Sequence, residues 1–286
     1  MNLIDIENKI GQKKPIYSES PTPGGAFAVA FGDIKAAIRM APMWLHTGWI
    51  EVVWKYRRTR LGPFWHTLSL AIFVIVMGVI WSKVLNQDPV DHFRYVGTSL
   101  IIWGLVASQV TDATGIFISG ESTSMSMRFP YVAFALKHAW TSLLLFAHHM
   151  ILYVVIMVGS QKFPGWPILL LAPALLLILA NGVWMSLIVG MLCLGKRDLV
   201  LVVGNAMQIM MFITPVFWPK DLLGSELAYA VDFNPLYHLL TIARVPMLGG
   251  VPPLTSWLWG IGTLIVGSCF TSWLYGRFRD RIAYWF

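Results

Sequence analysis

Long apolar stretches dominate the chain from residue 63 onward, and short polar breaks separate them. A helix needs about 20 apolar residues to cross the roughly 30 Å hydrocarbon core of a membrane. Six stretches reach that length, which predicts six membrane-spanning helices. They lie at 63–83, 95–118, 134–159, 167–193, 199–218 and 255–276.

The amino-terminal part has a different pattern. Residues 1–43 are polar, with a Pro/Gly-rich break at 21–25, and are expected to be a cytoplasmic tail that runs into a short helix at 32–40. In the segment 44–60, apolar side chains share one helical face: Trp44, Leu45, Gly48, Val52 and Tyr56. Basic residues gather at its end. This segment is too charged to span, so it is predicted to be an amphipathic helix in the membrane interface.

The stretch 219–254 is long and only partly apolar. Asn234 followed by Pro235 is typical of a helix start, and the helix is expected to stop before Pro246. That helix is too short to span. Because irregular backbone at membrane depth must be buried in protein or face water, we predict a re-entrant or interfacial hairpin at the outer mouth.

Composition supports an all-α polytopic membrane protein. Of the 286 residues, 57% are hydrophobic and only 12% are charged, about half the charged share of a soluble domain. The 14 Trp and 16 Phe fit rings that settle at the membrane boundary. The net charge of +7 is unevenly placed and does not resemble a nucleic-acid footprint, so no nucleic-acid partner is expected.

Basic residues indicate the orientation of the helices. With a cytoplasmic amino terminus, the cytoplasmic side holds the basic residues of the amino-terminal region and Arg128, Lys137, Lys196, Arg197, Arg277, Arg279 and Arg281. The outer side keeps Lys83, Arg94, Lys162, Lys220 and Arg244. By the positive-inside rule, both termini are expected in the cytoplasm and the chain in the inner membrane.

The stretch GMLCLGKRD (190–198) nearly matches a nucleotide-binding loop. Such a loop needs Ser or Thr after the lysine to hold Mg²⁺, and Arg197 stands there instead. It also follows a strand, whereas Gly190–Leu194 closes an apolar span. We therefore interpret the stretch as a tight cytoplasmic hairpin between the fourth and fifth spans.

Few side chains in the spans could carry chemistry. Asp112 is a single carboxylate, suited either to a direct role in a transport path or to a polar packing contact. His148 and His149 are neighbours that point about 100° apart, so interhelical hydrogen bonding is favoured over metal binding. Cys193 and Cys269 lie in apolar runs without metal-ligand spacing. No catalytic residue or metal site is predicted.

The spans are rich in aromatic residues that could be lipid anchors, core packing or stacking platforms for sugars. They are Trp65, Phe73, Trp81, Trp103, Trp184, Phe212, Phe217 and Trp218.

Four motifs together resemble a known family. They are KYRRTRLGPFWHTLS (55–69), GESTSMSMRFP (120–130), TPVFWP (214–219) and FNPLYHLLTIARVPMLGG (233–250). In this order, the chain resembles the membrane subunits of ABC-type polysaccharide exporters, above all the permeases that export O-antigen and capsular polysaccharide. The resemblance covers about residues 44–280.

The resemblance implies a half-channel that pairs with a second copy and with two copies of a separate ATPase. ATP and Mg²⁺ would bind to that ATPase, and no cofactor is expected on this chain. The loop 119–133 would couple to the ATPase through Glu121, Arg128 and Phe129, with Pro130 as a helix stop.

The resemblance also implies a lipid-linked polysaccharide as substrate. Lys55, Arg57, Arg58 and Arg60 lie at headgroup depth, where they could bind a diphosphate or simply anchor the topology. The path would be lined mainly by the first and fifth spans, with Trp65, Phe73, Phe212, Phe217 and Trp218. The outer hairpin would act as a gate, with Tyr237, His238 and Arg244 as sugar contacts.

Three other functions stay open. A drug or lipid exporter of the same broad superfamily is the main alternative. An integral-membrane transferase would need a carboxylate pair or a catalytic histidine that the chain does not assemble. A structural scaffold is weakly disfavoured by the polar outer hairpin and the basic entrance.

Overall fold

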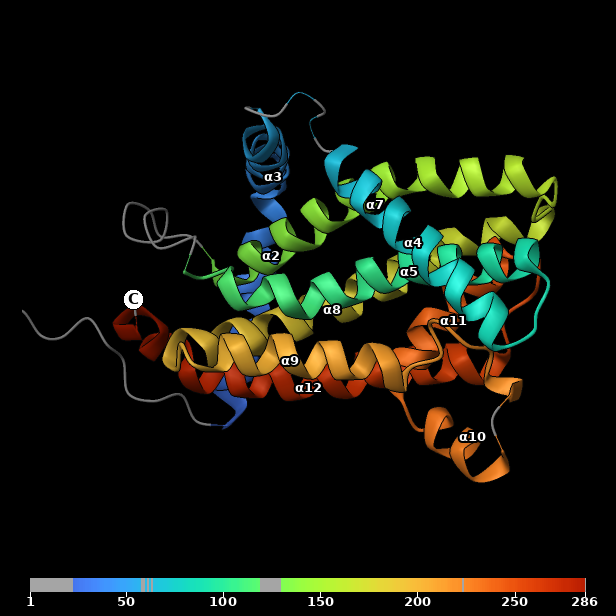
Figure 1. Ribbon diagram of the computed structural model, residues 1–286. Coiled ribbons are helices and arrows are strands. Elements are labelled where there is room, and N and C mark those ends of the chain that lie inside the picture. Colours follow the sequence, from blue (N-terminus) through green and yellow to red (C-terminus); the bar gives the residue numbers. More distant parts are fainter. Residues whose placement is uncertain are drawn as a thin grey trace, which may run out of the picture.

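The computed structural model describes residues 23–57, 60, 62, 64–118, 130–222 and 224–285 (Figure 1). Within these ranges every regular element is a helix, which confirms the predicted all-helical class. The long helices are α2 (Pro23–Arg39), α3 (Ala41–Tyr56), α4 (Phe64–Val84), α5 (Pro89–Thr111), α7 (Tyr131–Ser160), α8 (Leu171–Gly195), α9 (Leu199–Ile213) and α12 (Leu254–Trp285). The shorter helices are η1 (Asp112–Gly115), η2 (Trp166–Leu170), η3 (Lys220–Leu222), α10 (Ser225–Asp232) and α11 (Pro235–Met247).

Four of the described segments are long and apolar enough to cross a membrane. They are α4, α7, η2 together with α8, and residues 254–279 of α12. The predicted second and fifth spans correspond to α5, whose first turns are polar, and to α9, which has 15 residues. At 1.5 Å per residue α9 covers only about 22 Å. The count of six spans therefore stays a prediction.

Three helix boundaries differ from the predictions, and local signals explain two of them. The helix α5 begins at Pro89 because the Asp88 carboxylate accepts hydrogen bonds from the backbone N–H groups of Val90 and Asp91, at 2.9 and 3.0 Å. The helix α9 ends at Ile213, five residues before the predicted limit, because Thr214 is extended ahead of Pro215. The short amino-terminal helix expected at 32–40 begins earlier, at Pro23.

The prediction for the helix after Asn234 is partly wrong. Asn234 caps α11 by accepting a hydrogen bond from the Leu236 backbone N–H at 3.0 Å, as the sequence predicts. The helix does not stop before Pro246, however, but includes it and ends at Met247. Pro246 has no backbone N–H to donate, so the helix loses one hydrogen bond there, one residue before its end.

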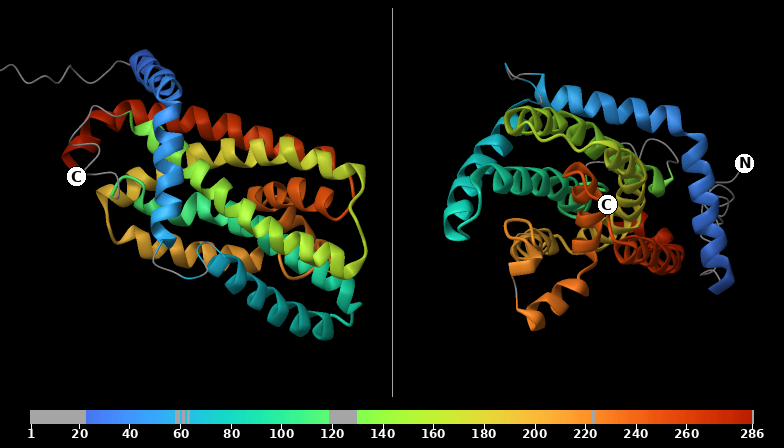
Figure 2. Two further views of the ribbon diagram at one scale, coloured as in Figure 1. Left: turned by 90° about the horizontal axis from the view of Figure 1, so that it is seen from above. Right: turned by 90° about the vertical axis from the view of Figure 1, so that its right-hand side faces the viewer.

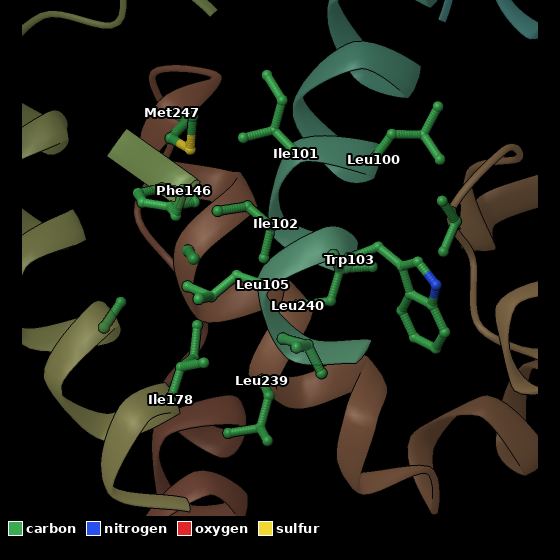
Figure 3. Close-up of a cluster of buried hydrophobic side chains, with 14 of the residues drawn as sticks. Leu100, Ile101, Ile102, Trp103, Leu105, Phe146, Ile178, Leu239, Leu240 and Met247 are labelled. Atoms are coloured by element: carbon green, nitrogen blue, oxygen red, sulfur yellow. The ribbon is translucent and has the colours of Figure 1, made fainter. Parts of the chain in front are cut away.

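The centre of the bundle is α5, which contacts α4, α7, α8, α9 and α11. Figure 3 shows Ile102 and Leu105 of α5 pointing toward Leu239 and Leu240 of α11, with Ile178 of α8 nearby. All five side chains are buried. Inside a membrane such a core gains its stability from close packing, because lipid tails are as apolar as the side chains.

The amino-terminal helix α3 is fixed to α7. Gly48 lies so close to α7 that an added Cβ would be 2.9 Å from the Trp140 ring. The Trp140 indole N–H donates a hydrogen bond to the Leu45 carbonyl at 3.1 Å, and Lys137 pairs with Glu51 at 2.8 Å. Figure 2 shows α3 crossing over the first part of α7.

The other amino-terminal helix, α2, packs on α12. Arg279 donates two hydrogen bonds to the Asp33 carboxylate, at 2.9 and 3.0 Å, and the Tyr275 hydroxyl donates a third. Gly276 permits this contact, because an added Cβ would lie 2.3 Å from the Ala26 carbonyl oxygen. The two ends of the described chain are therefore held together.

Basic side chains lie at both ends of the bundle. The turn between α8 and α9, with Lys196 and Arg197, lies at the same end as the last turns of α12 (Figure 1). The segment after α7, with Lys162, and the helix η3, with Lys220, lie at the opposite end of the bundle. Which of these two ends faces the cytoplasm stays a prediction.

Candidate functional site

An aromatic cluster joins α4 to the turn after α9. Phe217 is fully buried, and its ring stacks on Trp81 with a centroid distance of 6.2 Å and an interplanar angle of 10°. Phe73 meets Phe217 edge-on at 6.2 Å, and Phe212 lies at 5.8 Å. These are favourable separations for aromatic pairs. The structure therefore brings together Phe73, Phe212 and Phe217, which the sequence placed on the path.

The other two predicted path aromatics lie outside this ring cluster. Trp65 is exposed in the first turn of α4, and its carbonyl accepts a hydrogen bond from Ser69 at 2.9 Å. Trp218 is half-buried next to Phe217, and its carbonyl accepts a hydrogen bond from the Tyr95 hydroxyl at 3.1 Å. Trp218 thus helps to hold the turn, while Trp65 faces outward.

Helices α4 and α9 lie on the same flank of the bundle, on either side of α5 (Figure 2). Their outward faces are apolar: Ile72, Ile75 and Val79 on α4, and Leu201, Val202 and Ile209 on α9 are all exposed. Phe212 is 54% exposed although it touches the cluster. The cluster is therefore the inner edge of an apolar flank that no described segment of the chain covers.

Arg244 of α11 is buried and acts as a cross-link. Its Nη1 donates hydrogen bonds to the Tyr95 hydroxyl and the Pro215 carbonyl, both at 2.6 Å, and to Ser99 at 3.2 Å. The guanidinium also lies 4.6 Å from the centre of the Tyr95 ring, within the range of a cation–π contact. Arg244 thus ties α11, α5 and the turn after α9 together, and it points inward.

His238 is buried and holds the corner between α10 and α11. Its Nε2 lies 2.8 Å from the Asp232 carbonyl, and its Nδ1 lies 3.0 Å from the Ser256 hydroxyl. Because a carbonyl only accepts, Nε2 carries the proton and Nδ1 accepts from Ser256. Burial lowers the pKa of His238 below 6.5, although the Asp232 carbonyl and carboxylate raise it.

Tyr237 remains half-buried at the same corner. Lys220 lies 5.8 Å from the centre of its ring and forms a salt bridge with Asp232. Of the three predicted gate residues, Tyr237 alone keeps part of its side chain open to a ligand, since His238 and Arg244 are only 3% and 5% exposed.

The predicted entrance residues are exposed where they are described. The Arg57 guanidinium lies 4.6 Å from the centre of the Trp54 ring, and Lys55 Nζ lies 5.9 Å from that of Tyr56. Arg60 is exposed, and Arg58 lies outside the described residues. Exposed cations beside aromatic rings at the end of α3 suit a headgroup region.

A polar cavity of about 210 Å³ lies between α3, η1 and α7, close to this entrance. The Glu51–Lys137 salt bridge, Asp112 and His138 contribute to its lining. Sequence reasoning missed Glu51 and His138 because their meeting depends on how α3 docks on α7. A lysine inside an apolar span, Lys137, was the signal that a carboxylate partner should be sought.

Asp112 has a different setting from the one its place in a predicted span suggests. It is exposed in η1, just beyond the end of α5, and its carboxylate accepts a hydrogen bond from Thr111 at 3.4 Å. Of the predicted ATPase contacts, Glu121, Arg128 and Phe129 lie outside the described residues. Pro130 is buried and directly precedes α7.

The stretch 190–198 forms the helical hairpin that the sequence predicts. Gly190 packs against Ile116 and Phe117, and α8 continues to Gly195. Lys196 and Arg197 are exposed in the turn before α9. In the described part of the chain, no group of three His, Cys, Asp or Glu side chains is placed to hold a metal ion.

A protein-family model described as ABC-2 type transporter matches residues 46–248, well over half of the chain. The chain belongs to this family. The matched residues of the ABC-2 transporter include the aromatic cluster, the cavity beneath α3 and all of α11. It is a multi-pass membrane subunit of a transporter, as the resemblance of its motifs predicted.

Two curated relatives of this ABC-2 transporter are named as export permeases. A protein from Myxococcus xanthus named O-antigen export system permease protein RfbA is 22% identical over 193 residues, covering 67% of this chain and 74% of the relative. A protein of the same name from Klebsiella pneumoniae is 24% identical over 200 residues, covering 68% and 76%. Both confirm the similarity to O-antigen export permeases.

Proposed function

We propose that this chain is the transmembrane half-channel of an ATP-driven exporter for a lipid-linked polysaccharide. Family membership and the names of the relatives support this proposal. The observation that carries it is the apolar flank of α4 and α9 with the aromatic cluster at its inner edge. Rings suit a glycan, because stacking provides many weak contacts and no deep site in which one sugar would be trapped.

A second copy of the chain would cover this flank. The exposed side chains of α4 and α9 are large and apolar, and Phe212 of the aromatic cluster lies on the same face. Two copies related by a two-fold axis would present the same flank to each other. The path would then run between the two aromatic clusters. In this arrangement the six predicted spans cross the inner membrane with both termini in the cytoplasm.

The energy would come from two copies of a separate ABC ATPase. The coupling loop 119–133 directly precedes α7, and α7 carries α3 through Gly48, Trp140 and the Glu51–Lys137 salt bridge. A displacement of the loop by the ATPase would therefore move α7 and the docked α3 together. ATP and Mg²⁺ would be bound by the ATPase.

The entrance lies at the end of α3. Lys55, Arg57, Arg58 and Arg60 would bind the diphosphate that links lipid and glycan, because guanidinium groups match phosphate oxygens well. At the other end of the path the α10–α11 corner would act as the gate. Tyr237 would contact sugars there, while His238 and Arg244 hold the corner in place.

The test combines two measurements. The purified chain should bring down an ABC ATPase from its native membranes and change the rate of ATP hydrolysis. The triple change Arg57→Gln, Arg58→Gln and Arg60→Gln should reduce polysaccharide export at least tenfold, about 1.4 kcal/mol, which is within the range for charge-assisted contacts to a phosphate.

A control variant with Arg197→Gln removes one positive charge from the exposed turn between α8 and α9 and should export normally. Membrane insertion and ATPase binding should be unchanged in both variants. Normal export by the triple variant would show that the entrance residues only anchor the topology. A chain that never binds an ATPase would overturn the proposed function as a whole.

A further inference from the structure

An apolar groove of about 680 Å³ runs between α8 and α12. Trp184, Trp259 and Phe270 contribute to its lining, together with Gly262 and Gly267. An added Cβ at Gly262 would meet nothing within 4 Å, so the groove is open there. At Gly267 the Trp184 ring takes the space where a side chain would lie, since an added Cβ would be 2.3 Å from it.

The groove continues as an exposed stripe toward the carboxyl end of α12. Val266, Phe270, Trp273 and Arg277 follow one another at spacings of four, three and four residues, which places them on one helical face. The Phe270 and Trp273 rings lie 6.0 Å apart, and the Arg277 guanidinium lies 5.9 Å from the Trp273 ring. From Gly262 to Arg277 the stripe is about 22 Å long.

The two arginines at this end of α12 have different environments. Arg279 is paired with Asp33 of α2 and contributes to the fold. Arg277 is exposed, and among the described side chains no carboxylate lies within salt-bridge distance of it. Its positive charge stands at the end of the apolar stripe, where α12 leaves the segment 254–279 that is apolar enough to cross a membrane.

We propose that the groove and Arg277 together bind one anionic glycerophospholipid. One acyl chain would lie along Val266 and Phe270 into the groove, and the phosphate would meet the Arg277 guanidinium, with Trp273 at headgroup depth. Charge complementarity selects an anionic headgroup. The apolar lining excludes a glycan, because sugar hydroxyls would lose their hydrogen bonds there.

Trp259 contributes to the lining at the far end of the groove, where two ring contacts hold it. The Trp259 ring stacks on His238 at 5.2 Å and meets Phe233 edge-on at 6.4 Å. A stripe of about 22 Å suits an acyl chain of ordinary length better than a long polyprenyl chain. All of α12 lies beyond residues 46–248, while Trp184 of α8 lies within them. The proposal does not depend on which substrate is exported.

Binding to the purified chain in detergent tests the proposal directly. Phosphatidylglycerol and phosphatidylcholine with identical acyl chains are titrated separately, and bound lipid is counted by native mass spectrometry. The wild-type chain should bind one phosphatidylglycerol more tightly than phosphatidylcholine. The change Arg277→Gln should weaken phosphatidylglycerol binding about fivefold and weaken phosphatidylcholine binding less, because the choline group already balances the phosphate charge of that lipid. The matched control, Arg197→Gln, removes a charge at the same end of the bundle and should have a smaller effect.

A second variant fills the groove without a clash. Gly262→Leu places a side chain in the open space and should reduce the binding of both lipids severalfold, since the acyl chain loses its place. Gly159→Leu makes the same change at another exposed glycine with nothing within 4 Å and should bind lipid normally. Because glycine weakens helices, neither change should impair folding.

Several outcomes would overturn the proposal. Equal binding of the two lipids by the wild-type chain would remove the role of Arg277. Unchanged lipid binding by Gly262→Leu would show that the acyl chain does not lie in the groove. Displacement of phosphatidylglycerol by a polyprenyl phosphate, or a loss of dimers in Gly262→Leu, would assign the groove to another occupant. All readouts are of lipid binding or mass, so a negative result leaves the exporter proposal standing.

Discussion

At the scale of single residues, buried polar side chains decide how the outer hairpin is held. Arg244 makes three hydrogen bonds to groups far away in the sequence, and His238 bonds to Ser256 and to the nearer Asp232 carbonyl. Within an apolar interior, a polar group without a hydrogen-bond partner costs free energy, so these side chains are held where their partners lie. Two of the three residues that were predicted to contact sugars therefore make hydrogen bonds within the fold instead.

Replacing Arg244 should therefore destabilise the chain. Arg244→Met leaves the Pro215 carbonyl and the Tyr95 hydroxyl with fewer partners, and we expect the free energy of unfolding to fall by about 2 kcal/mol. Arg244→Lys should lower the free energy of unfolding by a smaller amount, because lysine keeps the positive charge although it lacks the planar guanidinium donors. Chemical unfolding of the purified protein in detergent measures both changes.

Tyr95→Phe provides the matched control in a double-mutant cycle. The effects of Arg244→Met and Tyr95→Phe should be non-additive by at least about 0.5 kcal/mol, because the two side chains share hydrogen bonds. Strict additivity would contradict the cross-link.

The buried His238 predicts a dependence of stability on pH. Its folded pKa lies below 6.5, so the unfolded chain takes up the proton first as the pH falls. The contribution of His238 to stability is complete above about pH 6.5 and is lost as the pH falls through the folded pKa. The thermal midpoint of His238→Gln should vary less than that of the wild-type protein between about pH 7.5 and pH 5. Equal slopes would contradict this assignment, since the other histidines are common to both proteins.

At the scale of elements, glycines set how closely helices approach. Gly48 brings α3 onto α7, and Gly276 brings α2 onto α12. The sequence predicted an amphipathic helix at 44–60. The helix α3 covers most of this segment but begins and ends slightly earlier, at Ala41 and Tyr56. The sequence could not predict the docking of α2 or α3, because a glycine inside a helix has the same local signature whether it touches a neighbour or lipid.

Enlarging Gly276 should detach α2. In Gly276→Ala the new methyl group collides with the Ala26 backbone, and we expect a loss of about 1–3 kcal/mol. Hydrogen exchange in α2 should increase, because the Asp33–Arg279 salt bridge is also pulled apart.

Gly159→Ala is the control for this change, since nothing lies within 4 Å of its added Cβ. That variant should be unchanged or slightly more stable. Equal protection of α2 in both variants would show that the close contact is unimportant.

At the scale of the whole molecule, the arrangement of the helices places Arg197 and Lys162 at opposite ends of the bundle. The predicted topology puts Arg197 in the cytoplasm and Lys162 outside. In a background without Cys193 and Cys269, an impermeant maleimide added to intact cells should label Lys162→Cys but not Arg197→Cys. Permeabilised cells should show labelling of both. The reverse pattern would invert the topology.

Much of the fold could be predicted because it depends on local chemistry. The excess of apolar residues required a membrane protein, and the cap at Asn234 and the turn at Lys196 followed from residue types within a few positions. The destinations of side chains were decided by the tertiary structure alone. The inward turn of Arg244, the meeting of Glu51 with Lys137 and the stacking of Phe217 on Trp81 each join segments far apart in the chain. Such contacts depend on helix packing, which the periodicity of one helix does not specify.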